Sequence, residues 1–129
     1  MRAALFLLVS AVPAAAQSFD CTVQDFVTFS KSDTAFVQQN LEKRYRLTVG
    51  EEIVTLEMFS KHFTDAKTLY RITQRRISNL TATDDNAARH GAITLPLSPR
   101  ARIGRNGYFN ATVSVSGSFY SNTWLLHCR

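Results

Sequence analysis

Two cysteines near the two ends of the chain constrain this sequence more than any other feature. Cys21 lies at the start of the first regularly patterned segment, and Cys128 is the residue before the last. In an oxidising compartment such a pair forms a disulfide. The bond would close a loop of about a hundred residues, which stabilises a fold by roughly 4–5 kcal/mol in the chain-entropy model. We therefore expect the first and last segments to lie side by side.

The beginning of the chain predicts export, which is the condition for that disulfide. Arg2 gives a short positive start, residues 3–12 are almost wholly apolar, and Ala14 and Ala16 supply the small residues of a cleavage site. A membrane span needs about 20 apolar residues, and this stretch is shorter. We predict a signal peptide over residues 1–16 and a protein of the periplasm or the extracellular medium, without a transmembrane segment.

The remaining residues, 17–129, have the composition of one folded domain. Aromatic residues make up 11% of the sequence, which argues against a disordered chain. Lysine and arginine total 15 against 10 aspartate and glutamate residues, a formal net charge of +5. A charge of this size favours weak attraction to anionic surfaces and does not identify a nucleic-acid binder. We expect no nucleic-acid partner.

Alternating apolar and polar residues predict seven or eight short strands. They cover residues 19–29, 45–49, 53–59, 68–73, 77–83, 93–97, 108–117 and 120–128, and the fourth and fifth could be one bent strand. A short helix fits residues 34–43, capped by Ser32 or Asp33. The sequence therefore predicts an all-β fold, a small antiparallel barrel or sandwich with its terminal strands joined by the disulfide. The disulfide favours a barrel, because closure places those strands together.

Two of the predicted strands have a definite inner face. The first turns one set of apolar residues inward, namely Phe19, Cys21, Val23, Val27 and Phe29. In the last strand Trp124, Leu126 and Cys128 share a face, and we expect Trp124 to be buried.

No arrangement typical of catalysis or of metal binding is present. His62, His90 and His127 do not lie at metal-site spacing from one another or from a cysteine. The sequence also has no nucleophile elbow, no glycine-rich phosphate loop and no paired-carboxylate motif. We expect a protein that is not an enzyme and holds no metal or cofactor.

Two groups of arginines are the surface feature that most suggests a ligand. Arg71 and Arg75 share one face of an alternating strand, while Arg100, Arg102 and Arg105 crowd one turn-rich loop. If the fold brings the groups together, they form a patch for phosphate or carboxylate, and otherwise they are a solvated basic face. The partner of such a patch would be an anionic glycolipid or glycan of the cell envelope, or an envelope protein.

The segment SVSGSFY, residues 114–120, resembles the S-x-S-G-x-x-Y segment of the periplasmic inhibitors of c-type lysozyme. Those inhibitors are small exported barrels with a disulfide, and their serine-bearing loop enters the lysozyme cleft. The resemblance implies that Ser116 and Tyr120 contact a cell-wall hydrolase. This chain departs from that family in having no lysine after Lys67.

A broader resemblance rests on the two ends of the predicted domain. The opening Phe19-Asp20-Cys21 and the last strand, from Trp124 to Cys128, are similar to those of small exported β proteins of proteobacteria. That resemblance implies no particular activity.

The sequence leaves two functions open. The first is an exported binding module for an anionic envelope component, and the second is an inhibitor of a cell-wall hydrolase. A deep apolar cavity would favour the first, whereas a filled core with a protruding loop at residues 114–120 would favour the second.

Overall fold

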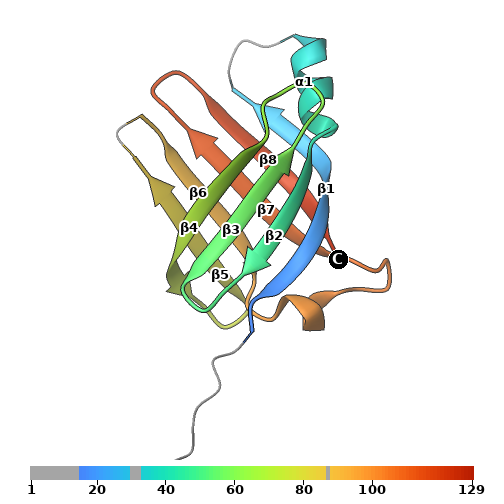
Figure 1. Ribbon diagram of the computed structural model, residues 1–129, viewed down its shortest axis with the longest axis vertical. Helices are drawn as coiled ribbons and strands as arrows, with labels where there is room; N and C mark the ends of the chain where they lie inside the picture. Colours follow the sequence, from blue (N-terminus) through green and yellow to red (C-terminus); the bar gives the residue numbers. More distant parts are fainter. Residues whose placement is uncertain (1–14, 30–32, 87) are drawn as a thin grey trace, which may run out of the picture.

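The chain folds into a closed antiparallel barrel in which each strand pairs with the next and the last pairs with the first (Figure 1). The computed structural model describes residues 15–29, 33–86 and 88–129, so most of the predicted signal peptide lies outside the described residues. The strands are β1 Gln17–Thr28, β2 Arg44–Val49, β3 Ile53–Phe59, β4 Ala66–Arg75, β5 Asn79–Asp85, β6 His90–Pro96, β7 Phe109–Ser116 and β8 Ser121–Cys128. The two segments that could have been one bent strand are separate, β4 and β5.

The terminal strands are joined covalently, as predicted. Cys21 of β1 lies directly opposite Cys128 of β8, and the two form a disulfide. The ladder continues beyond the bond, because Asp20 and Arg129 exchange two backbone hydrogen bonds of 3.0 Å. The open choice between barrel and sandwich is thereby decided in favour of the barrel.

Apolar side chains from all eight strands fill the interior. The most deeply buried of them include Leu47, Val54, Leu80, Ile93 and Leu126. An eight-stranded barrel has an interior just wide enough to be filled by side chains. The middle of this barrel is accordingly a packed core.

The second half of β1 departs from its predicted face. The pairing of β1 with β8 shifts between Val23 and Asp25, which is a β-bulge. The extra residue reverses the alternation, so Phe26 turns inward while Val27 and Phe29 turn outward. Val27 is 52% and Phe29 84% exposed, so the prediction that both point inward is wrong.

A short helix, α1 (Thr34–Leu41), covers one end of the barrel, which we call the helix end (Figure 1). The Asp33 carboxylate caps it by accepting a 2.8 Å hydrogen bond from the backbone nitrogen of Phe36. The helix lies where the sequence predicted one and ends two residues earlier. Ser32, the alternative cap, lies outside the described residues.

Buried aromatic side chains close the helix end. Trp124 is 7% exposed, which confirms its predicted burial, and its Nε1 donates to Oδ1 of the buried Asn40 at 3.3 Å. Phe26 packs on the indole, with the ring centroids 5.2 Å apart. The Lys43 ammonium lies 4.5 Å from the ring centre of Phe63 and 4.8 Å from that of Trp124.

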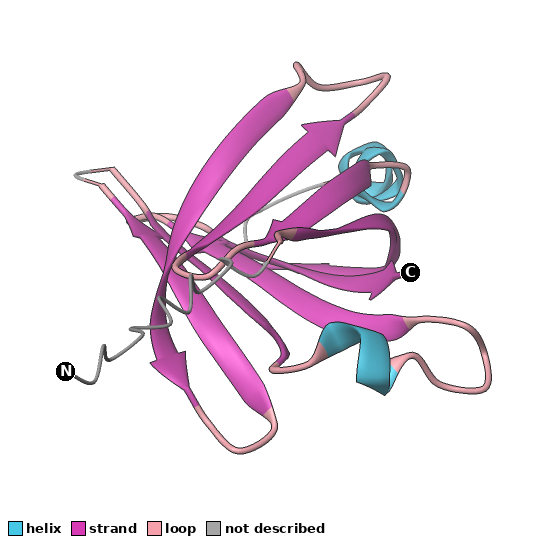
Figure 2. Cartoon of the chain, turned by 60° about the horizontal axis from the view of Figure 1, so that its bottom comes forward, coloured by secondary structure: helices cyan, strands magenta, loops and turns pink. Residues whose placement is uncertain are grey.

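The other end, which we call the mouth end, carries the β2–β3 and β4–β5 turns and the segment between β6 and β7. That segment contains a 3-10 helix, η1 (Pro99–Arg102). Figure 2 brings this end forward, with η1 at its edge. Over the described ranges, no helix is long and apolar enough to cross a membrane.

Candidate functional site

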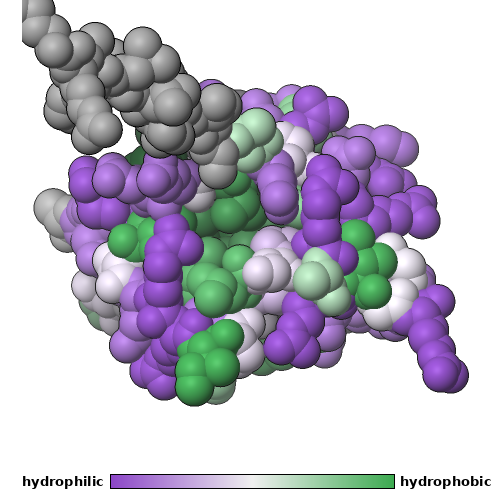
Figure 3. Space-filling view, turned by 90° about the horizontal axis from the view of Figure 1, so that it is seen from below, coloured by the Kyte–Doolittle hydropathy of each residue, from purple (hydrophilic) through white to green (hydrophobic). Residues whose placement is uncertain are grey.

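The mouth end holds an open cavity of about 400 Å³. Its apolar wall comes from Val49 at the end of β2, Leu80 near the start of β5 and Leu97 just after β6. Arg75, at the end of β4, and Arg100, in η1, line the same cavity. Seen from below, this end shows apolar surface at its centre, framed by hydrophilic side chains (Figure 3). We call it the mouth cavity.

Arg75 reaches the cavity because β4 also contains a bulge. The pairing of β4 with β5 shifts between Ile72 and Gln74, so Arg75 lies opposite the buried Leu80 while Arg71 lies opposite Thr83. The prediction that Arg71 and Arg75 share one face is therefore wrong.

A contact with the neighbouring turn holds Arg75 across the rim of the mouth cavity. Its Nη2 donates a hydrogen bond to the backbone oxygen of Glu51, in the β2–β3 turn. Arg71 lies near Arg75, because both arginines line a smaller depression together with Glu51 and Glu52. The Glu51 and Glu52 carboxylates offset part of the positive charge on this side.

Of the three loop arginines, only Arg100 lines the mouth cavity. The guanidinium carbon of Arg100 lies 5.4 Å from the ring centre of Phe19, an arrangement typical of a cation–π contact. Arg102 and Arg105 are exposed, and neither lines the mouth cavity. The structure thus brings Arg75 and Arg100 together, keeps Arg71 nearby, and leaves Arg102 and Arg105 on the surrounding surface.

Exposed apolar residues accompany the arginines at this end. Ile77, in the β4–β5 turn, is fully exposed, and Leu97 and Ile103 are each more than a third exposed. Cationic and apolar groups therefore both occur at the mouth end, which suits a ligand with both anionic and apolar parts.

The residues implied by the lysozyme-inhibitor resemblance lie at the opposite end. The Ser116 hydroxyl lies 3.1 Å from that of Ser121, a cross-strand contact between β7 and β8. The Tyr120 ring lies over Gly117, where an added Cβ would come within 2.4 Å of it. Phe119, at the tip of the same hairpin, is 96% exposed. Ser116 and Tyr120 are engaged within the hairpin, and Phe119 is its most accessible large apolar side chain.

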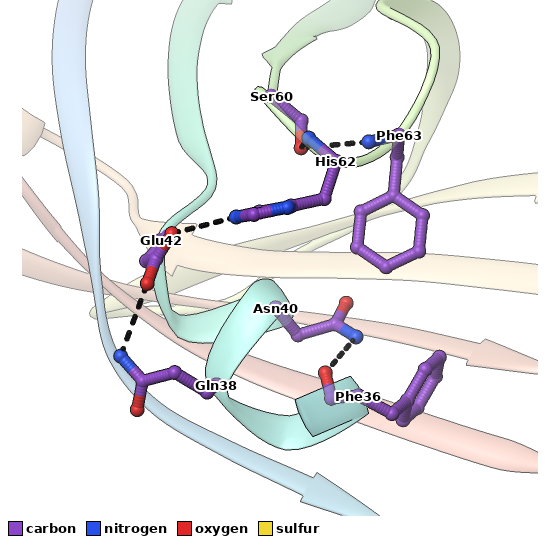
Figure 4. Close-up of polar contacts among 7 residues, drawn as sticks. All are labelled: Phe36, Gln38, Asn40, Glu42, Ser60, His62 and Phe63. Carbon is purple, nitrogen blue, oxygen red and sulfur yellow. Dashed lines mark hydrogen bonds and ion pairs between the residues drawn. The ribbon is translucent and has the colours of Figure 1, made fainter. Parts of the chain in front are cut away.

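A serine, a histidine and a glutamate gather where α1 meets the β3–β4 loop (Figure 4). Nε2 of His62 lies 2.8 Å from Oε2 of Glu42, and this hydrogen bond is the main cause that lowers the pKa of Glu42. The Ser60 oxygen, however, accepts hydrogen bonds from the backbone nitrogens of His62 and Phe63. Among the described residues no hydrogen bond joins the Ser60 hydroxyl to the His62 ring, so the cluster links helix to loop without the nucleophile–base contact of a catalytic triad.

The other two histidines also have local partners. His90 contacts the Asp85 carboxylate across the β5–β6 pair, and His127 stacks on Tyr108 with ring centroids 3.9 Å apart. Within the part of the chain that the structure describes, no three metal-ligating side chains form a group.

A second hollow, which sequence reasoning missed, lies on the outer wall of the barrel along β1. It has a volume of about 640 Å³, and its charged and aromatic walls include Arg44, Arg46, Tyr108, His127 and Arg129. The alternation of Arg44 and Arg46 signals that both face outward, but the sequence alone does not say which strands lie beside them. We call this hollow the β1 groove.

Comparison of the chain with protein-family models, with curated proteins and with solved structures finds no match.

Proposed function

We propose that this protein is an exported binding module that holds an anionic amphiphile, such as an envelope glycolipid, at its mouth cavity. The observation that carries the proposal is the pairing of two guanidinium groups, Arg75 and Arg100, with an apolar wall in one cavity. Phosphate or carboxylate groups would bind the arginines through charge-assisted hydrogen bonds. The apolar part of the ligand would contact Val49, Leu80 and Leu97.

The dimensions of the cavity fit this kind of ligand. Its volume of about 400 Å³ lies within the roughly 300–1,000 Å³ typical of small-molecule sites. The packed core closes the cavity from below, so an acyl chain would rest at the mouth rather than thread the barrel. Cleavage after residue 16 would remove Ala15, which lines one edge of the cavity, and would widen it.

Export is part of the proposal. The disulfide favours a compartment outside the cytoplasm, where such bonds persist. The predicted signal peptide over residues 1–16 supplies the route. A protein of the periplasm or the extracellular medium would meet anionic glycolipid directly.

The test is the binding of residues 17–129 to lipopolysaccharide at low and at moderate salt. We expect binding that weakens as salt rises, because the arginines are exposed and screened. A double variant, Arg75→Ala with Arg100→Ala, should lose at least about tenfold in affinity, since each guanidinium contributes a charge-assisted contact.

The matched control is Arg89→Ala, which removes an exposed arginine from the helix end, where Arg89 lies 3.7 Å from Asp84. The control should bind as the unchanged protein does. Equal loss in both variants, or no binding by the unchanged protein, would rule out the mouth cavity.

Two observations favour inhibition of a cell-wall hydrolase as a second candidate. The middle of the barrel is filled, and the β7–β8 hairpin presents Phe119 at 96% exposure. The assay is lysis of a cell-wall suspension by c-type lysozyme, with and without this protein. Inhibition that disappears in Phe119→Ser would support the candidate, and undiminished lysis at a large excess of this protein would end it.

A further inference from the structure

The β1 groove has the layout of a binding site independent of the mouth cavity. Its floor is β1, which lies between β2 on one side and β8 on the other. In one row Asp20 lies between Arg46 and Arg129, and in the next Thr22 lies between Arg44 and His127. The two rows are about 7 Å apart along the strand, the rise of two residues. Short side chains on the floor and long ones on both sides make the hollow.

The groove carries more positive charge than it neutralises. The Asp20 carboxylate lies 3.6 Å from Nε of Arg46, and both side chains are mostly exposed, so this ion pair orients Arg46 at little energetic gain. Among the described residues, no aspartate or glutamate side chain lies within ion-pair distance of Arg44 or Arg129. Their guanidinium groups are therefore available, one on each side of β1.

Aromatic surface lines the same groove. Tyr108 and His127 are stacked 17° from parallel, which fixes both rings in place. Phe59, at the end of β3, is 43% exposed and lies directly across the ladder from Arg44. Flat apolar faces beside hydrogen-bonding groups suit the rings of a sugar better than they suit a small inorganic anion.

The positive surface extends toward the helix end. Thr22 and Arg44 also line a second depression of about 410 Å³, whose other charged residues are Lys43, Lys61 and the single carboxylate Glu42. A continuous track therefore runs from Arg129 and Arg46 past Arg44 to Lys61, whereas the Lys43 ammonium points away from it, onto the rings of Phe63 and Trp124. Its length suits a chain of charged units.

We infer that the β1 groove binds an acidic glycan, a saccharide chain bearing carboxylate or phosphate groups. The arginines would hold the acidic groups, and Tyr108 and Phe59 would contact the sugar rings. Thr22 and Asp20 on the floor would accept hydrogen bonds from sugar hydroxyls. A single-stranded nucleic acid fits less well, because its phosphodiester backbone would meet the Asp20 carboxylate and offers few hydroxyl donors.

The experiment is a titration of residues 17–129 with a fluorescently labelled polyuronate hexasaccharide at low salt. We expect saturable binding, and none to a neutral hexasaccharide of the same length. Exchanging both guanidinium groups for amides, in Arg44→Gln with Arg129→Gln, should weaken binding at least about tenfold. Tyr108→Ala should weaken it less, because it removes ring contact and leaves the charge unchanged.

Two control variants separate this groove from other basic surface. Arg89→Gln removes one positive charge between β5 and β6, across the barrel from β1, and Arg75→Ala with Arg100→Ala removes two at the mouth cavity. Both should bind the hexasaccharide within about twofold of the unchanged protein. The melting temperature of each variant, measured in parallel, shows that the barrel is intact.

Three outcomes would overturn the inference. They are no saturable binding of the hexasaccharide, equal binding by the unchanged protein and the Arg44/Arg129 variant, and tighter binding of a thymidine oligonucleotide than of the glycan. Loss of binding only in the Arg75/Arg100 variant would also overturn it and would assign the glycan to the mouth cavity. The lipopolysaccharide experiment can fail without affecting this one.

Discussion

At the residue scale, the least expected feature is a lysine among aromatic rings. Burial lowers the pKa of Lys43 to about 8. The faces of Phe63 and Trp124 favour the charged amine and so oppose the effect of burial. Burial, reinforced by the Asp84 carboxylate, raises the pKa of Tyr70 to about 12, and burial also raises the pKa of Tyr45.

These shifts predict a maximum of stability in mild alkali. Between pH 8 and about 10.4 the unfolded chain keeps a proton that folded Lys43 has released, so the free energy of unfolding rises with pH. Above about pH 10 the tyrosines of the unfolded chain lose protons that folded Tyr45 and Tyr70 retain. The free energy of unfolding therefore falls again. Urea unfolding measured from pH 7 to 12 would show the maximum.

Lys43→Met is the variant that isolates the lysine. It should abolish the rise above pH 8 and leave the fall above pH 10 in place. A free energy of unfolding that stays level from pH 8 to 10 in the unchanged protein would mean that the aromatic faces outweigh burial.

At the element scale, α1 and β1 show how local chemistry acts on the barrel. The Asp33 carboxylate holds the first turn of α1, and Phe36 from that turn contacts the Phe26 ring at a centroid distance of 5.8 Å. Phe26 faces inward only because of the bulge in β1. The helix cap and the bulge thus meet at one aromatic cluster, which closes the helix end.

Removal of the cap should loosen that end. Asp33→Ala should lower the free energy of unfolding by about 1 kcal/mol, the usual cost of losing an N-cap hydrogen bond. Iodide should also quench Trp124 fluorescence more strongly, because α1 would cover the indole less well. Asp33→Asn is the control, since an asparagine oxygen caps equally well. Unchanged stability in Asp33→Ala would show that packing alone holds the helix.

The strands could be predicted from the sequence, whereas the faces of two of them could not. Alternation located the strands, and the disulfide indicated that the first and last are neighbours. A bulge adds one residue and reverses the alternation after it. In β1 the only hint of the bulge in the sequence is Asp25, a charged residue at a predicted inward position. Its carboxylate accepts a 2.8 Å hydrogen bond from the backbone nitrogen of Phe26.

The same limit applies to the candidate sites. Strict alternation placed Arg75 on the same face as Arg71, but the β4 bulge turns Arg75 toward the mouth cavity. The β1 groove depends on which side chains β2 and β8 set beside β1. The strand registers decide that arrangement, and no single segment reveals them.

At the scale of the whole molecule, the disulfide joins the first strand of the barrel, β1, to the last, β8. It links Cys21 to Cys128, which are 107 residues apart in sequence, at a Cα separation of 4.1 Å. Nearly the whole described chain lies within the loop that it closes. Its largest effect is therefore on the unfolded chain, whose freedom it restricts.

Loss of the disulfide should be costly. Cys21→Ser with Cys128→Ser should lower the free energy of unfolding by roughly 2–5 kcal/mol, the range for native disulfides in small secreted domains. The measurement is urea unfolding, with intact mass showing that the unchanged protein has no free thiol. Cys128→Ser alone should be similarly destabilised, since either change breaks the bond. Wild-type stability in the double variant would contradict this account.

Closure of the barrel also limits how other molecules can engage the chain. Each of the eight described strands already has a hydrogen-bonded neighbour on both sides. A partner cannot extend the sheet by adding a strand of its own, and copies of this protein cannot join edge to edge. Recognition must therefore use side chains, at the mouth, at the hairpin tips or along the outer wall. The same closure protects a folded chain of this kind against growth into amyloid-like fibrils.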